Sequence, residues 1–203
     1  AVPDNGVMFS AGDQIYAVDL GDVNAGETWQ AFRKGKPLMN PDNPKEVMGM
    51  EVNYLGDVRV KREGDVTTLS VISAKEEIAI GDRLVRAPEK QFINYVPHLP
   101  AQVVEAKVMS TYGGVAEAGS LTTVVLNRGA LDGLDVASVL FSYKAPRPVK
   151  KESRSEPERL TPPLKSGNLV VYRVFPTISY ALVLDSTLPV NIGDIARAEP
   201  VAE

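Results

Sequence analysis

One segment of this sequence occurs twice. Residues 67–88, TTLSVISAKEEIAIGDRLVRAP, align without a gap with residues 179–200, SYALVLDSTLPVNIGDIARAEP, at an offset of 112. Gly81-Asp82 then meets Gly193-Asp194. A repeated segment constrains the fold more than any other feature here, because both copies have to satisfy one backbone plan.

Two further matches keep the same order along the chain. AGDQIYAV (11–18) aligns with AGSLTTVV (118–125) at an offset of 107, which also places Gly26 on Gly133, and GMEVNY (49–54) aligns with GNLVVY (167–172) at 118. The matches predict two copies of one β unit, residues 1–92 and residues 101–203, joined by a proline-containing connector at 93–100. The alternative is that β segments with similar turns align by chance.

The composition of the short segments is typical of strands. Runs rich in Val, Ile, Leu, Thr and Tyr alternate with glycines, seven of which are followed by Asp or Glu. Glycine accepts a positive φ and Asp bonds to nearby backbone, so these dipeptides favour chain reversals. We therefore predict an all-β protein of about fourteen short strands, arranged as two similar small lobes that are barrel-like or sandwich-like. The best helical candidate is short, at 89–95.

Residues 144–166 differ from the rest of the chain. The stretch holds five prolines and no aromatic residue, and its seven basic and three acidic residues give it a net charge of +4. Such a segment buries too little apolar surface to offset the entropy lost on ordering. It predicts a long, exposed and mobile hairpin loop, either a basic arm for an anionic surface or a solvated insertion without a partner.

Composition excludes several classes of function. The net charge of −4 argues against general nucleic-acid binding, which requires a basic face. The absence of cysteine excludes disulfides, thiolate metal sites and cysteine nucleophiles. No run approaches 18 apolar residues, so we expect no transmembrane segment, and the first residues lack the pattern of a signal peptide. A mature form and an excised fragment would both look like this.

Catalytic motifs do not emerge from the sequence. His98 is the only histidine, and there is no Gly-x-Ser-x-Gly elbow, phosphate-binding loop or dinucleotide fingerprint. Most carboxylates near glycines are explained as turn formers. We therefore assign no catalytic, cofactor-binding or metal residue and expect no enzyme. A hydrolase with a carboxylate pair or a Ser-Lys contact in a deep pocket remains an alternative.

Three residues are candidate glycan contacts. Trp29 is the only tryptophan and lies near Arg33, and aromatic rings can stack on the faces of sugars. Tyr95 is a third candidate. The alternative for Trp29 and Tyr95 is packing in a core, which is where most large aromatic side chains lie.

Several stretches resemble the region that follows the LysM module in LysM peptidoglycan-binding-domain proteins of Gram-negative bacteria. They are YLGDVRVKREGDVTTLSV, EIAIGDRLV, NYVPHLP, VVLNRGALDGLDVASVL and LVVYRVFPTISYALVL, and they extend over most of positions 47–195. The LysM module itself is not in this sequence, so peptidoglycan binding cannot be carried over to any residue.

The resemblance implies a protein of the periplasm or cell envelope whose partners are peptidoglycan or envelope proteins. We therefore expect a non-enzymatic accessory or scaffolding region of an envelope protein, without a cofactor. The alternative is a structural adaptor of an envelope assembly, such as a secretion or flagellar machine. Exposed strand edges offer a physical route to binding in both cases.

Overall fold

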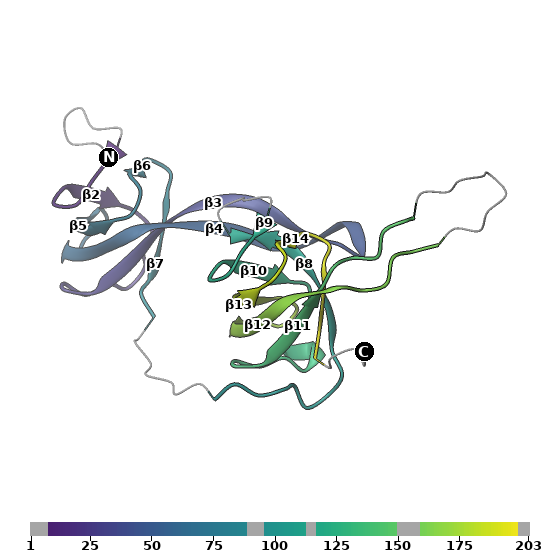
Figure 1. Cartoon of the computed structure of the whole chain (residues 1–203). Helices are drawn as coiled ribbons and strands as arrows, with labels where there is room; N and C mark the ends of the chain where they lie inside the picture. The colour runs from purple at the N-terminus through teal and green to yellow at the C-terminus, as the bar shows by residue number, and fades with distance from the viewer. Residues whose placement is uncertain (1–7, 89–95, 113–116, 150–158, 199–203) are drawn as a thin grey trace. The chain divides into compact units, whose positions relative to one another are not determined.

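The computed structural model describes residues 8–88, 96–112, 117–149 and 159–198, and these are almost entirely β-structure (Figure 1). The all-β prediction is confirmed: the described residues form strands β1 to β15, with one 3-10 turn, η2 (Ala130–Asp132). The helical candidate at 89–95 lies outside the described residues. Among the described residues, no helix has the length and apolar character needed to cross a bilayer.

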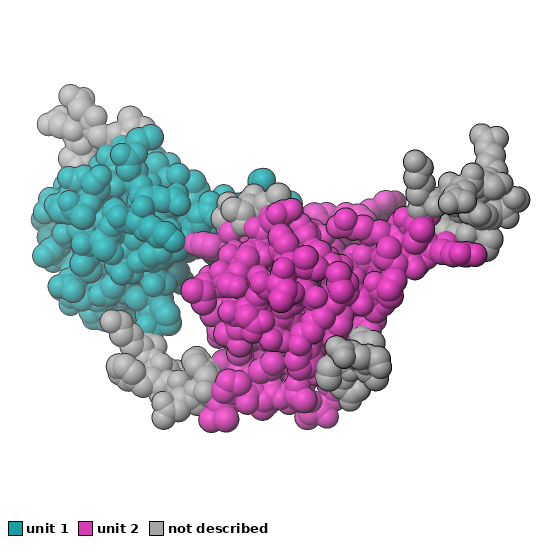
Figure 2. All heavy atoms as spheres, in the orientation of Figure 1, with its two compact units in different colours: residues 1–37, 50–92 teal, residues 38–49, 93–203 magenta. Residues whose placement is uncertain are grey.

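The chain forms two compact units (Figure 2). Unit 1 comprises residues 1–37 and 50–92, and unit 2 comprises residues 38–49 and 93–203. The chain thus divides near residue 92, close to the end of the expected first lobe. Residues 38–49 belong to unit 2, whereas the sequence placed them in the first lobe.

Unit 1 is built on an open five-stranded sheet. Its strands lie in the order β2 (Gln14–Ala17), β5 (Thr67–Ala74), β4 (Asn43–Arg62), β3 (Thr28–Asn40) and β7 (Arg83–Arg86), and a short ribbon pairs β1 (Met8–Phe9) with β6 (Ile78–Ala79). β3 and β4 are much longer than the short strands that the sequence suggests. The core contains Ile15, Trp29, Ala31, Leu55, Val58, Val60, Leu69, Val71 and Ile78.

Unit 2 is a closed six-stranded barrel. The strands follow the order β10 (Thr123–Leu126), β13 (Ser179–Ser186), β12 (Lys165–Val174), β11 (Val139–Tyr143), β15 (Ile195–Arg197) and β8 (Glu105–Thr111), and β8 returns to β10. A ribbon pairs β9 (Glu117–Ala118) with β14 (Val190–Asn191). The barrel is filled mainly by Val, Leu and Ala side chains.

The two units follow one strand plan. The order β2-β5-β4-β3-β7 of unit 1 recurs as β10-β13-β12-β11-β15 in unit 2. The gapless offset of 112 carries β5 onto β13 and β6 onto β14, as the sequence predicted. The same offset brings the start of β7 to the start of β15.

Matching hydrogen bonds confirm this plan in detail. In unit 1 the Val71 N–H donates to the Asp13 carbonyl at 2.9 Å, and in unit 2 the Val183 N–H donates to the Thr122 carbonyl at 2.9 Å. The residue numbers of Val71 and Val183 differ by 112, whereas those of Asp13 and Thr122 differ by 109. The chain between the first of these strands and the second is therefore three residues longer in unit 2 than in unit 1.

The offset of 107 predicted for the first strand is wrong by two residues. Gln14 lies opposite Ser70, and Thr123 lies opposite Leu182. Because Ser70 and Leu182 are equivalent at 112, Gln14 is equivalent to Thr123, at an offset of 109. An offset that is wrong by two residues still places inward side chains on inward side chains, because the side chains of a strand alternate with a period of two. The hydrophobic pattern therefore could not reveal the error.

The offset of 118 predicted for β4 and β12 is also wrong. Gly56 lies opposite Ala74, and Gly167 lies opposite Ser186, so Gly167 is equivalent to Gly56 and not to Gly49. The true offset is 111. A Cβ on Gly56 would lie 2.0 Å from the Ser73 carbonyl oxygen, and a Cβ on Gly167 would lie 2.2 Å from that of Asp185. Both positions require glycine for the same steric reason.

The third corrected match concerns the turn before β3. Gly26 corresponds to Ala137 and not to Gly133, because the Gly26 N–H donates to the Val60 carbonyl and the Ala137 N–H donates to the Val171 carbonyl. Both residues have a positive φ, 89° for Gly26 and 76° for Ala137. A search for paired glycines therefore missed the equivalence.

The segment predicted as a mobile loop at 144–166 has paired arms. The Val149 N–H donates to the Arg159 carbonyl at 2.8 Å, and the Thr161 N–H donates to the Arg147 carbonyl at 2.9 Å. The predicted mobility falls largely on residues 150–158, which lie outside the described residues.

The end of the β3–β4 hairpin is packed within unit 2. Leu38 shares an apolar cluster with Met109, Val125 and Ile178 on the outside of the barrel. Asp42 accepts a hydrogen bond from the Lys107 Nζ at 2.6 Å. The apolar cluster with Leu38 covers Val125 on the outer face of β10, while Val124 and Leu126 face the barrel core. β10 is therefore buried on both faces, which explains its continuous apolar run in the sequence.

Candidate functional site

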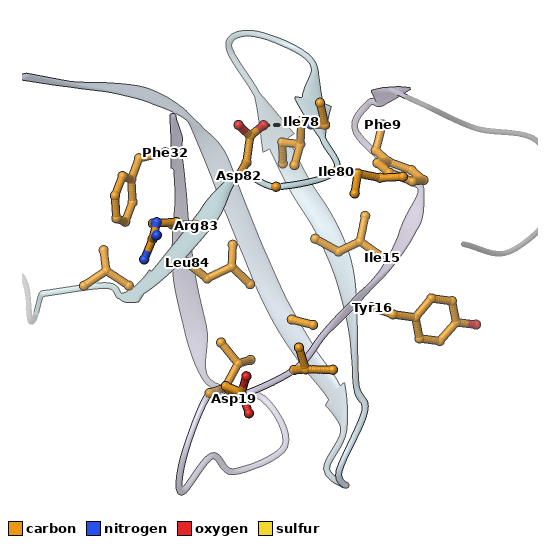
Figure 3. Close-up of a pocket in the computed structure, with 16 residues that line it drawn as sticks. Phe9, Ile15, Tyr16, Asp19, Phe32, Ile78, Ile80, Asp82, Arg83 and Leu84 are labelled. Carbon is orange, nitrogen blue, oxygen red and sulfur yellow. Dashed lines mark hydrogen bonds between the residues drawn. The ribbon is translucent and has the colours of Figure 1, made fainter. Parts of the chain in front are cut away.

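A cavity of about 610 Å³ lies in unit 1 between β2 and β7 (Figure 3). We call it the β2–β7 groove. It is lined by Phe9, the run from Ile15 to Leu20, Phe32 and the run from Ile78 to Val85. Figure 3 shows Ile15 of β2 and Leu84 of β7 directed toward the space between these strands, whereas Tyr16 points away. The volume falls in the range of ordinary ligand sites.

The groove is bounded by two strand edges. In the part of the chain that the structure describes, β2 pairs only with β5 within its sheet, and β7 pairs only with β3. An unpaired edge presents backbone N–H and C=O groups to any extended chain that approaches it. The groove therefore combines an apolar floor with backbone donors and acceptors along two sides.

Asp82 is held in place beside the groove. Its carboxylate accepts two hydrogen bonds from Arg33, at 2.8 and 2.7 Å, and one from the Ala79 N–H at 2.7 Å. Burial by itself would raise the pKa of Asp82, but the hydrogen bonds from Arg33 and Ala79 outweigh burial and hold the pKa below its ordinary value. Asp82 is thus an ionised structural group that fixes the turn, unsuited to act as a general acid.

Unit 2 contains the same ion pair at the equivalent positions. Lys144 corresponds to Arg33 at an offset of 111, and its Nζ lies 2.8 Å from the Asp194 Oδ2. The Asp194 carboxylate also accepts a hydrogen bond from the Asn191 N–H, as Asp82 does from Ala79. The recurrence in both units indicates a role in the strand plan.

Two of the three glycan candidates, Trp29 and Arg33, are engaged in contacts within unit 1. The side chain of Trp29 is buried in the core of unit 1, with only 7% of the residue exposed, and the Arg86 guanidinium covers its ring at 5.6 Å from the centroid. A ring covered in this way cannot stack on a sugar, so the core alternative holds for Trp29. Arg33 is engaged by Asp82. Tyr95 lies outside the described residues.

His98 belongs to a polar cluster in unit 2. Its Nε2 lies 2.9 Å from the Asp135 Oδ1, its Nδ1 lies 2.9 Å from the Val96 carbonyl oxygen, and the Ser138 hydroxyl donates to Asp135. The hydrogen bond with the Val96 carbonyl and then that with Asp135 raise the pKa of His98. The carboxylate separates the serine from the histidine, so the histidine cannot activate the serine as a base. The cluster pins the connector to the barrel.

The described residues give little support to a metal site or to catalysis by a carboxylate. No group of three or more His, Asp or Glu side chains in residues 8–88, 96–112, 117–149 and 159–198 could hold a metal ion. The Asp42 carboxylate contacts Lys107, Asn127 and Arg128, and the hydrogen bond from Lys107 lowers its pKa despite some burial. This carboxylate fastens the hairpin end.

The groove residues were not identified from the sequence. Val18 and Val85 are 58% and 48% exposed, yet their segments read as ordinary strands. No protein-family model matches the chain, and no curated protein resembles it closely enough to count as a relative.

Proposed function

We propose that this chain is a non-enzymatic scaffolding module of a Gram-negative cell-envelope protein, and that it works by holding another polypeptide in the β2–β7 groove. The observation that supports this function is a groove with both apolar and polar lining residues, flanked by two strand edges that have no further partner among the described residues. Strand edges bind peptides through main-chain hydrogen bonds, and side-chain pockets add selectivity.

The groove favours binding over catalysis. Its buried carboxylate, Asp82, is neutralised by Arg33 and hydrogen-bonded to backbone. A hydrolase would need a second titratable group within reach of a substrate, poised to exchange a proton. The remaining carboxylate of the lining, Asp19, is exposed at the rim. A holding role also agrees with the resemblance to the companion region of LysM proteins, which implies the envelope compartment.

A retention experiment tests this function. The chain is immobilised and exposed separately to purified peptidoglycan sacculi and to solubilised envelope proteins, at low and at high salt. We expect retention of an envelope protein by the unaltered chain and its loss with Val18→Asp, which places a charge in the groove. Ile72→Asp is the control, because Ile72 is 43% exposed on β5 and does not line the groove.

Two results would contradict the proposal. Retention of sacculi alone, unaffected by Val18→Asp, would assign binding to glycan and to another surface. Loss of the envelope protein with both variants alike would show that the groove is not the binding element.

A further inference from the structure

We propose that two paired arms of unit 2 bind the surface of a lipid bilayer that contains anionic headgroups. The arms are residues 144–149 and 159–164, which leave the barrel between β11 and β12 and run side by side (Figure 1). They belong to unit 2, whereas the β2–β7 groove belongs to unit 1. Binding by the arms therefore goes beyond the proposed function and does not depend on it.

Backbone pairing holds the two arms together along their described length. At the barrel, the Lys144 N–H donates to the Leu164 carbonyl at 2.8 Å. Further out, Pro148 lies opposite Leu160 in an antiparallel bridge. At the rise of a strand, about 3.3 Å per residue, six residues extend about 20 Å. The arms therefore carry their side chains away from the barrel, and Figure 2 shows them projecting from unit 2.

The positive charge of this segment lies on the arms. The arms and Lys165, which follows them, carry four cations and no Asp or Glu, whereas the chain between the arms has three residues of each sign. Arg147 and Arg159 are exposed on the arms. Lys144 is paired with Asp194 at 2.8 Å, so three cations are left for a partner. Because the whole chain carries −4, an anionic surface would attract it by the arms.

Exposed apolar side chains accompany these cations. Val149 is 46% exposed, Leu160 is 59% exposed and Leu164 is 58% exposed. Each of these side chains would gain free energy on leaving water. Apolar groups that gather on one exposed segment are typical of an interaction site with a protein or a membrane. The arms thus offer both an electrostatic and a hydrophobic contribution to binding.

The pairing places apolar and cationic side chains on different faces. Because neighbouring residues of a strand face opposite ways, Pro148 and Leu160 lie on one face of the arms and Arg147 and Arg159 lie on the other. A segment with one apolar and one cationic face can lie in the plane between hydrocarbon and charged headgroups. The long arginine side chains can then extend to the phosphates while the apolar face enters the bilayer.

Proline makes a lipid surface a better partner for the arms than the edge of another sheet. Pro146, Pro148, Pro162 and Pro163 have no N–H to donate, so the arms cannot form a continuous ladder with an added strand. The same absence of donors lowers the cost of placing this backbone near hydrocarbon, where an unpaired N–H is unfavourable. The partner chemistry that fits is therefore an anionic bilayer.

Vesicle binding by the full 203-residue chain tests this assignment. The probes are vesicles of phosphatidylglycerol with phosphatidylethanolamine and vesicles of phosphatidylcholine alone, and flotation measures the bound chain. We expect binding to the anionic vesicles, weaker at high salt, and little binding to the neutral ones. Excess inorganic phosphate should not displace the chain from the vesicles, because free phosphate provides no apolar layer for the leucines.

Charge variants separate the arms from the rest of the surface. Arg147→Gln combined with Arg159→Gln should weaken binding about 25-fold, because each cation close to an anionic lipid surface contributes about fivefold. The matched control is Arg59→Gln combined with Arg62→Gln, which changes the net charge equally at two exposed positions of β4. This control should bind within about twofold of the unaltered chain, since surface substitutions away from a contact have small effects.

A neutral variant tests the apolar contribution at constant charge. Leu160→Gln should weaken binding about fivefold or more, because it removes an apolar side chain from the interface. Leu131→Gln is the control, since Leu131 is 78% exposed in η2, outside the arms. All of the substituted side chains are exposed, so the variants should fold, which circular dichroism checks.

Each contrary outcome overturns the assignment. Equal binding to anionic and neutral vesicles, or equal losses in the arm variants and their controls, would show that the charge of the arms does not direct binding. Retention by peptidoglycan sacculi without binding to vesicles, or displacement by inorganic phosphate, would assign the arms to an anionic polymer or to phosphate instead of a bilayer. The arm variants should retain an envelope protein in the groove as the unaltered chain does, so failure of one proposal is distinguishable from failure of the other.

Discussion

Among the described residues, units 1 and 2 build the same ladder of five strands, and β8 closes the ladder of unit 2 into a barrel. In unit 2, β8 links β15 to β10 and the barrel has no free edge. In unit 1, β2 and β7 stand as the edges of an open sheet and the cavity lies between them. The difference of one strand separates a sealed core from an accessible groove, because a strand that closes a barrel also covers the floor beneath it.

The comparison also separates what the strand plan requires from what each unit adds. Both units hold a cation against a buried carboxylate, Arg33 with Asp82 and Lys144 with Asp194. Both bring a glycine against a neighbouring carbonyl, at Gly56 and at its counterpart in β12. Features present twice belong to the plan, whereas the groove lies in unit 1 beside β2 and β7, the counterparts of the two strands that β8 joins in unit 2.

The largest expected effect comes from a charge on the inward face of β8, the strand that closes the barrel of unit 2. Val108 is fully buried in the barrel, so Val108→Asp should destabilise unit 2 by about 4 kcal/mol or more. Amide hydrogen exchange should show loss of protection in unit 2 and retention in unit 1. The comparison variant Val18→Asp, at an exposed position that lines the groove of unit 1, should change the stability of unit 1 by only about 0.5 kcal/mol. Equal losses in both variants would contradict the view that unit 1 is open.

The buried ion pairs should differ in strength. The side chain of Lys144 is 19% exposed and that of Arg33 is 43% exposed. Asp194→Asn leaves a half-buried ammonium group without its counter-ion and should cost about 3 kcal/mol. Asp82→Asn leaves a cation that water can reach and should cost about 1–2 kcal/mol, mostly through lost hydrogen bonds.

Chemical denaturation followed by amide exchange measures both losses, because exchange reports the two units separately. Ile72→Asp serves as the surface control for unit 1. A larger loss for Asp82→Asn than for Asp194→Asn would show that exposure of the cation does not set the strength of this pair.

The sequence predicted the alignment of the two units best at turns whose backbone conformation requires a particular residue type. The segment from Thr67 to Asp82 was aligned correctly with its copy, since the turn glycine and the following Asp recur with the same spacing. Both turn glycines have a positive φ, 95° and 90°. The all-β class followed from the same turns and from the strand runs between them.

Other pairs of equivalent residues in the two units could not be identified from residue identity. Gly26 is matched by Ala137, which adopts the same backbone without being glycine. The groove was missed because it lies beside two strands whose counterparts in unit 2 are joined by β8, and the sequence of β8, EAKVMST, contains only one β-branched apolar residue. Nor does local sequence indicate that residues 38–49 complete unit 2, since that depends on the partners of Leu38 and Asp42.

Adding one methyl group to each of the two close-approach glycines tests the equivalence of β4 and β12. Gly56→Ala and Gly167→Ala should each destabilise their own unit by about 1–3 kcal/mol, because both would overpack against a backbone carbonyl. Gly119→Ala is the control, since no atom lies within 4 Å of a Cβ at that position. Similar losses measured by amide exchange would support the offset of 111, and a loss in only one unit would contradict it.

The smallest expected effect is a pH dependence confined to unit 2. The hydrogen bond with the Val96 carbonyl, followed by that with Asp135, raises the pKa of His98 above its ordinary value of 6.5. A group whose pKa is raised on folding stabilises the folded state below its unfolded pKa, and this contribution disappears as pH rises through the folded pKa. The His98 contact with Asp135 should therefore weaken from about pH 6.5 upward. In unit 1, the position of Asp135 is taken by Asn24, which does not titrate.

Nuclear magnetic resonance titration of the His98 ring measures this effect. We expect a pKa above 6.5 in the unaltered chain and a lower one in Asp135→Asn, together with faster amide exchange at Val139, whose N–H donates to the His98 carbonyl. Amides of unit 1 should show no matching change between pH 6 and pH 8. If His98 titrated at or below 6.5, or if exchange in unit 1 changed equally, the connector would not be fastened to unit 2 by a charged histidine, and this difference between the units would vanish.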